Sequence, residues 1–129
     1  MRWRALSARG QVEISSTPNT HPLSPLLLDF KSARESLPEA PLPFSAAYPG
    51  GRSRVVAHID AARISHARRF GAPPVGMWPA EGAVSGDFVR HLAAADCRWI
   101  ASREGVLNNS LAASKIIDPG AAYHPWKLE

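Results

Sequence analysis

The sequence predicts an α/β protein with parallel strands. Between residues 57 and 102, helical and strand patterns alternate, and only short connections separate them. This order of helix, strand, helix and strand is typical of a parallel sheet or barrel, in which each helix leads back to the start of the next strand. The length of 129 residues suits one domain or a piece of one.

The first helix of this series is predicted over residues 57–70. Apolar residues recur there at steps of three to four, at Ala57, Ala61, Ile64, Ala67 and Phe70. Gly71 then stands where a glycine commonly ends a helix, and Pro73 and Pro74 follow it. The sequence therefore marks the end of this helix clearly.

Two short strands and a second helix follow. Residues 75–78 form a short apolar run typical of a buried strand, and residues 98–102 form another. Between them, Ser85 is a good N-cap residue, and Asp87 places a negative charge in the first helical turn. The helix that they start carries one apolar face, made of Phe88, Leu92 and Ala95.

The N-terminal part of the chain has weaker signals. Residues 11–15 alternate in polarity and predict a short strand, which ends in the turn-rich residues 16–22. Residues 23–30 are apolar enough for a brief helix. Residues 38–51 are rich in proline, glycine and small side chains and predict an irregular connection.

Composition and charge exclude several classes of protein. The net charge is +4, but the arginines are scattered along the chain, so we expect no nucleic-acid partner. No apolar run reaches the roughly 18 residues of a membrane span. Residues 1–4 are not followed by the apolar segment of a secretory signal. We therefore expect a cytoplasmic protein without membrane contact.

The sequence offers no cofactor or metal signature. Cys97 is the single cysteine and is expected to be a small core residue. Four histidines lack ligand spacing with carboxylates and are expected on the surface or on helix faces: His58, His66, His91 and His124. We predict no metal site and no cofactor.

Residues 76–85 are the most informative stretch for function. Glycines and Pro79 fix a tight path there, and Glu81 follows Trp78 just after a predicted strand. Such a turn presents an active-site acid beside an aromatic face. The same Glu81 also suits a plain structural role as a favourable charge near the start of the next helix, and Trp78 suits core packing.

Three predicted strands end near an acidic residue. Glu13 lies by the end of the first strand, Glu81 follows the second and Glu104 follows the third. In parallel α/β folds, residues after the C-terminal strand ends form the site. We therefore expect these three carboxylates at one rim. His21 stands alone in its turn, where a histidine commonly donates a structural hydrogen bond.

With those residues marked, the sequence resembles glycoside hydrolase family 57, the amylase and amylopullulanase-like enzymes that act on α-glucans. The stretch Gly10–Ser15, with Thr17-Pro18 and His21-Pro22, looks like one family region, and Phe70–Ser85 looks like the next. Residues 98–107 resemble the strand and loop that follow, and residues 123–126 resemble the segment after those.

The resemblance implies a fold and a chemistry. The implied fold is part of an incomplete, seven-stranded (β/α) TIM-like barrel, of which this chain supplies about three or four parallel strands with intervening helices. Glu81 occupies the position of the catalytic nucleophile. Trp78 would stack on a sugar ring, and His21, Glu13 and Glu104 would contact an α-glucan or maltooligosaccharide.

Two family regions and one residue depart from this pattern. An early histidine-containing strand and a later Asp-Gly-Glu region, which supplies the general acid/base, have no counterpart here, and Arg103 stands where an acidic residue is usual. We therefore expect residues 1–129 to be a partial catalytic barrel, weak or inactive alone.

Two other functions are alternatives to a glycoside hydrolase. A metal-dependent polysaccharide deacetylase has a similar barrel, but it needs an Asp-Asp pair and a His-x-x-x-His set that do not occur here. A noncatalytic carbohydrate-binding or interaction module, derived from the same barrel, would keep Trp78 and its loop without turnover.

Overall fold

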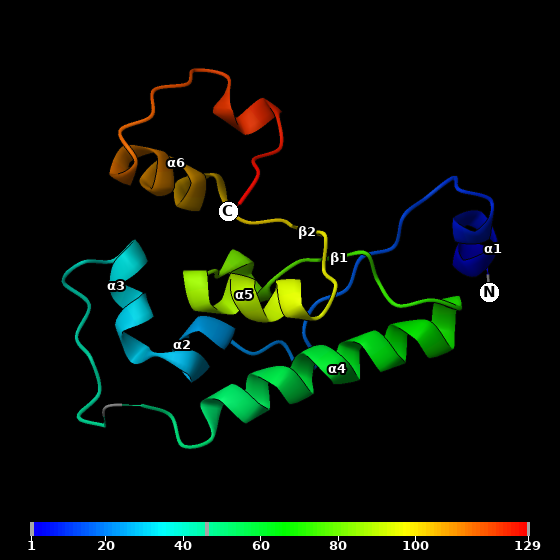
Figure 1. Cartoon of the computed structure of the whole chain (residues 1–129), viewed down its shortest axis with the longest axis horizontal. Helices are drawn as coiled ribbons and strands as arrows, with labels where there is room; N and C mark the ends of the chain where they lie inside the picture. Colours follow the sequence, from blue (N-terminus) through cyan, green and yellow to red (C-terminus); the bar gives the residue numbers. More distant parts are fainter. Residues whose placement is uncertain (1, 46, 129) are drawn as a thin grey trace.

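The computed structural model of the chain describes residues 2–45 and 47–128. Its regular elements are small except for one long helix (Figure 1). The helices and strands are α1 (Arg2–Ala8), α2 (Ser24–Leu28), α3 (Ala33–Ser36), α4 (Gly51–Phe70), β1 (Gly76–Met77), α5 (Gly86–Ala94), β2 (Trp99–Ile100) and α6 (Glu104–Ala113). Three 3-10 turns complete them, namely η1 (Phe30–Ser32), η2 (Ala80–Gly82) and η3 (Ala121–Tyr123).

Helix α4 confirms the predicted helix but begins earlier and buries a different face. Its end is as predicted, because Gly71 adopts φ 97° at the C-cap and its N–H bonds the carbonyl of Ala67. The buried positions, however, are Gly51, Val55, Ile59, Ala62 and His66. Ile64, which the apolar series placed on the inner face, is exposed. The buried stripe includes a polar residue, His66, so the spacing of apolar residues did not indicate which face of the helix is buried.

The two predicted strands after α4 are present and parallel. Gly76 of β1 pairs with Trp99 of β2, and Met77 pairs with Ile100. The strand predicted over residues 11–15 is wrong as a regular element, because those residues have no strand assignment. Only Ser16 makes a bridge, to Met77, which is also parallel. Three parallel segments therefore lie side by side in chain order, where the sequence predicted three or four strands.

The core lies between this small sheet and the helices on one of its faces. Met77 packs with residues of α4 and α5, and the cluster consists of Val55, Ile59, Ala62, Met77, Phe88 and Leu92. Partly buried residues pack against the edge of this cluster, among them Leu27 and Leu28 of α2 and Cys97. Cys97 was predicted to be a small core residue, and it contributes to the core at this edge. In Figure 1, α5 lies between the strands and the long α4, which gives a layered α/β arrangement. Fully burying such side chains stabilises the fold by about 1.5–3 kcal/mol each.

Helix α5 begins as predicted. The Ser85 side chain accepts a hydrogen bond from the N–H of Phe88, and Phe88 and Leu92 are buried on one face. The brief helix predicted over residues 23–30 is α2. Apart from Ala46, which lies outside the described residues, the predicted irregular connection is confirmed up to α4, which begins at Gly51. Among the described helices, none combines the length and the apolar character that crossing a membrane demands.

Candidate active site

Glu81 lies in the turn η2, immediately after β1. The turn is closed by two hydrogen bonds, from the N–H of Gly82 to Pro79 and from the N–H of Ala83 to Ala80. Glu81 itself adopts φ 55°, a left-handed conformation that costs a non-glycine residue free energy. Its side chain is 61% exposed. The turn therefore presents the carboxylate to solvent, as the sequence predicted.

His21 holds one oxygen of that carboxylate. Its Nε2 lies 3.1 Å from Oε1 of Glu81, so this ring nitrogen donates and the carboxylate accepts. His21 is also left-handed, with φ 57°, and its backbone N–H bonds the carbonyl of Pro18. Two left-handed residues, 60 positions apart in sequence, thus meet through their side chains. Backbone conformations of this kind are concentrated at functional sites.

Arg103 approaches the other oxygen. Its Nη2 lies 3.5 Å from Oε2 of Glu81. The arginine reaches that point by passing over Gly82, where an added Cβ would lie 3.1 Å from Cγ of Arg103. Ser102 fixes the same turn, because its hydroxyl donates to the carbonyl of Gly82 at 2.6 Å. The end of β2 therefore supports the turn that carries Glu81.

The electrostatic consequence is that Glu81 sits between two donors, one of which is always cationic. Both partners are exposed, so solvent screens their attraction to the carboxylate, and their main effect is to orient it. An oriented and accessible carboxylate can act as a nucleophile or can bind hydroxyl groups.

Trp78 stands beside this turn and is not a core residue. It is 53% exposed, and its backbone N–H donates to the carbonyl of Ser16 at 2.8 Å. Because side chains alternate along a strand, Trp78 lies on the same sheet face as Gly76, opposite the core-facing Met77. The exposed indole therefore offers an aromatic surface next to Glu81.

The other two predicted carboxylates do not join Glu81. Glu13 accepts a hydrogen bond from the indole Nε1 of Trp99 at 2.6 Å. Glu104 is the first residue of α6, where a negative charge is favourable. In the described part of the chain, neither carboxylate is hydrogen-bonded to Glu81 or to its two partners. The side-chain contacts of Glu81 in the described residues therefore come from His21 and Arg103, and the shared rim of three carboxylates stays a prediction.

The sequence did not indicate two contacts of this region. Trp99 had no signal beyond its place in a strand, and the contact of Arg103 with Glu81 depends on how β2 ends. His66, expected on the surface or on a helix face, lies on the buried face of α4 and is 9% exposed. Its Nδ1 lies 2.7 Å from the carbonyl of Ala72 and its Nε2 lies 2.9 Å from the carbonyl of Ile14.

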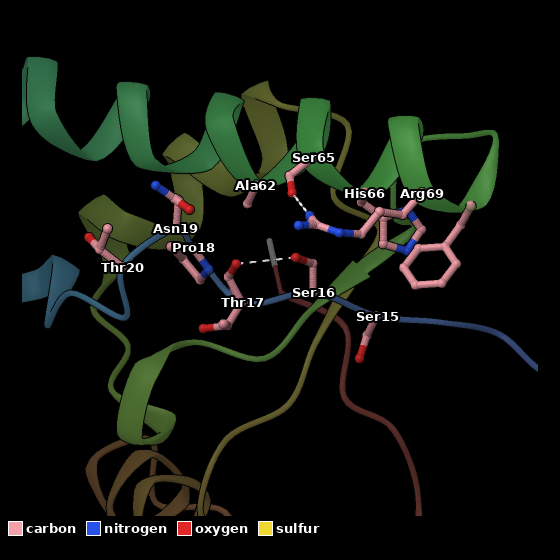
Figure 2. Close-up of a pocket in the computed structure, with 11 residues that line it drawn as sticks. Ser15, Ser16, Thr17, Pro18, Asn19, Thr20, Ala62, Ser65, His66 and Arg69 are labelled. Carbon is pink, nitrogen blue, oxygen red and sulfur yellow. Dashed lines mark hydrogen bonds between the residues drawn. The ribbon is translucent and has the colours of Figure 1, made fainter. Parts of the chain in front are cut away.

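A cavity of about 210 Å³ lies between residues 15–20 and the side of α4 that faces them (Figure 2). Hydroxyl groups line it, together with His66 and with Arg69, which is hydrogen-bonded to Ser65. A second cavity, of about 630 Å³, is lined by residues around Pro73 and Cys97. Glu81 lines neither of them. The Glu81 group therefore lies on an open surface, apart from both cavities.

An exposed carboxylate beside an exposed tryptophan, at the carboxyl end of a parallel strand, is an arrangement typical of enzymes that act on sugars. The comparison with protein families agrees, because the model for glycosyl hydrolase family 57 matches residues 2–129. The chain belongs to glycosyl hydrolase family 57. No curated protein and no solved structure matches it. Family membership places the chain among glycoside hydrolases, whose substrates are carbohydrates.

Proposed function

We propose that this chain carries the nucleophile of a retaining glycoside hydrolase that acts on α-glucans, and that Glu81 is that nucleophile. The single observation that supports this most is the Glu81 carboxylate itself, which is accessible and held by His21 and Arg103. Trp78, exposed beside it, is proposed to stack on a glucose ring. Glu104 is proposed to hydrogen-bond sugar hydroxyls from the start of α6.

The proposed reaction has two steps. An oxygen of Glu81 attacks the anomeric carbon, the bond from that carbon to the leaving oxygen breaks, and the leaving oxygen takes a proton from a general acid. Water, deprotonated by the same group, then attacks the anomeric carbon and releases Glu81. His21 and Arg103 hold the carboxylate in one orientation for the first step.

The reaction also needs a general acid/base, and we propose that this second carboxyl group lies outside the hydrogen-bonded neighbours of Glu81. Retaining enzymes place their two carboxyl groups roughly 5 Å apart. In residues 2–45 and 47–128, the hydrogen-bonded neighbours of Glu81 are bases, not acids. We propose that residues 1–129 are a partial (β/α)₇-type barrel and that the general acid/base belongs to another part of it. The three parallel segments in chain order support this, because successive barrel strands are ordered in the same way.

A noncatalytic carbohydrate-binding module is the second candidate. It is favoured by two observations, namely that the side-chain hydrogen bonds of Glu81 in the described residues come from His21 and Arg103 and that Trp78 and Trp99 are both exposed. A module of this kind would bind an α-glucan through its aromatic side chains and would not need an ionised nucleophile.

The experiment that tests the proposal is turnover and trapping with matched variants. The purified chain, Glu81→Gln and Glu39→Gln are incubated with a fluorinated maltosyl fluoride, whose activated leaving group needs no general acid and which traps the covalent intermediate, and separately with a chromogenic maltooligosaccharide. We expect the label on the peptide that contains Glu81 and no label in Glu81→Gln, and any turnover that the chain shows should fall by about 10⁴-fold in that variant. Glu39→Gln, the same chemical change at an exposed site with no role in the proposal, should keep the label.

The outcomes separate the two candidates. Label on a different carboxylate, or equal turnover in Glu81→Gln, would refute Glu81 as the nucleophile. Glucan binding without turnover or label, unchanged by Glu81→Gln, would support the binding module instead.

A further inference from the structure

Trp99 of β2 lies flat across a glycine of the neighbouring strand. The register pairs Trp99 with Gly76. A Cβ added at Gly76 would lie 1.9 Å from Cε2, 2.2 Å from Cδ2 and 2.4 Å from Cζ2 of the Trp99 indole. Real Cβ atoms do not approach other atoms this closely, so only glycine leaves room for the ring here. One face of the indole therefore rests on the backbone of β1.

A second contact fixes the edge of the same ring. The indole Nε1 donates to Oε1 of Glu13 at 2.6 Å, across 86 residues of sequence. A hydrogen bond to an ionised acceptor is shorter and stronger than one between neutral groups. Gly76 thus supports the ring from below, and Glu13 prevents it from rotating within its plane.

The rest of the indole is accessible. Trp99 is 39% exposed although it is held at two points. Since one ring face covers Gly76, the exposed surface belongs to the opposite face and the outer edge. Trp78 directly follows β1, and its N–H bonds the carbonyl of Ser16, so the strand alternation continues and places Trp78 on the same side of the sheet as Gly76. Two exposed tryptophans therefore share the sheet face that is turned away from the core.

We propose that Trp99 is a sugar-binding platform on which a pyranose ring of the carbohydrate substrate stacks, with Glu13 as its positioning residue. The choice of an α-glucan as that carbohydrate rests on the proposed function. An indole that is fixed before binding loses little conformational freedom when the sugar arrives, which favours affinity. Glu13, for which the sequence predicted direct sugar contact, acts here through Trp99.

Binding of maltoheptaose by titration calorimetry tests the platform, because it does not require turnover. We expect Trp99→Ala to weaken the affinity by about tenfold and Trp99→Phe to weaken it less, since a smaller aromatic face remains. Trp3→Ala removes an exposed tryptophan from α1 and is the matched control, with affinity unchanged. Thermal unfolding of each variant verifies that it is folded.

Two further variants test the support of the ring rather than the ring itself. Gly76→Ala keeps Trp99 and Glu13 but displaces the indole, so affinity should fall as in Trp99→Ala. If that variant does not fold, Glu13→Leu and Glu13→Gln replace it. Glu13→Gln keeps an oxygen acceptor for the indole and should retain affinity, whereas Glu13→Leu should lose about threefold. Where turnover is present, KM should rise in Glu13→Leu while kcat changes little.

Failure of the platform and failure of the proposed function are distinguishable. Equal affinity in Trp99→Ala and wild type would overturn the platform, whatever Glu81→Gln does to turnover. If wild type does not bind maltoheptaose, a panel of β-linked and mannose-based oligosaccharides is used. Binding from that panel that depends on Trp99 would support the platform and refute the α-glucan assignment. Binding of no saccharide would overturn the platform.

Discussion

Replacing His66 by leucine should strongly destabilise the protein. His66 joins three segments, because it projects from α4 and contacts the carbonyls of Ala72 and Ile14 at 2.7 and 2.9 Å. Leucine has a similar size and keeps the apolar contacts, but it cannot donate a hydrogen bond. The substitution would therefore remove the N–H that pairs with one of these two carbonyls.

The magnitude follows from that one hydrogen bond. An imidazole with a single N–H donates to only one of the two carbonyls at a time. Leaving a buried acceptor unpaired costs roughly 1–3 kcal/mol, which is a sizeable part of a total stability of about 5–15 kcal/mol. With a urea m-value of about 1–3 kcal/mol per molar, the unfolding midpoint should fall by about 0.5–1.5 M.

Urea unfolding monitored by far-UV circular dichroism measures this change. The matched control is His58→Leu on the same helix, where the ring contacts only Thr20 at an exposed position. That variant should remain within about 0.5 kcal/mol of wild type. If His66→Leu also falls within that margin, His66 does not hold residues 14 and 72 to α4, and the reasoning is refuted.

Two further predictions concern the C-terminal turn and Cys97. The hydrogen bond between Nε2 of His124 and Asp118 raises the pKa of His124, and the same bond lowers the pKa of Asp118. The stabilisation from His124 is complete below about pH 6.5 and is lost as pH rises through its raised pKa. That from Asp118 is complete above about pH 3.9 and is lost as pH falls through its lowered pKa. The NMR shift of the Trp126 indole N–H, which bonds Ala121 beside the His124 ring, should follow the alkaline change in wild type and not in His124→Gln. An identical titration in both would contradict the assignment. Burial raises the pKa of the Cys97 thiol, so iodoacetamide at pH 7.5 should alkylate it at least about tenfold more slowly in the folded chain than in urea, as measured by mass spectrometry. Equal rates would show that the thiol is open to solvent.

Local pattern was sufficient for the elements between residues 51 and 102. The glycine that ends α4 and the serine cap of α5 are fixed by interactions within a few residues, so their sequence signals are direct. The two short strands were indicated by their apolar runs, although each depends on the other for its pairing. The first strand could not be predicted in the same way. Residues 11–15 alternate in polarity, but strand structure needs a partner along its length, and only Ser16 has one.

In the candidate site, too, local features were predictable from the sequence and long-range contacts were not. Glu81 and Trp78 were predicted because a tight Gly/Pro turn after a strand exposes whatever side chains it carries, whichever fold surrounds it. The partners of Glu81 were not predictable as partners, because His21 lies 60 residues away and Arg103 lies 22 residues away. The same holds for Trp99 and Glu13, which are separated by 86 residues.

The sequence by itself determined the turns, the helix caps and the exposure of the Glu81 side chain, since each depends on short-range backbone preferences. Tertiary structure alone decided which face of α4 is buried, which donors hold Glu81 and why Gly76 has to be a glycine. Those outcomes depend on the distance between atoms that the chain brings together from far apart, and spacing along the sequence does not encode that distance.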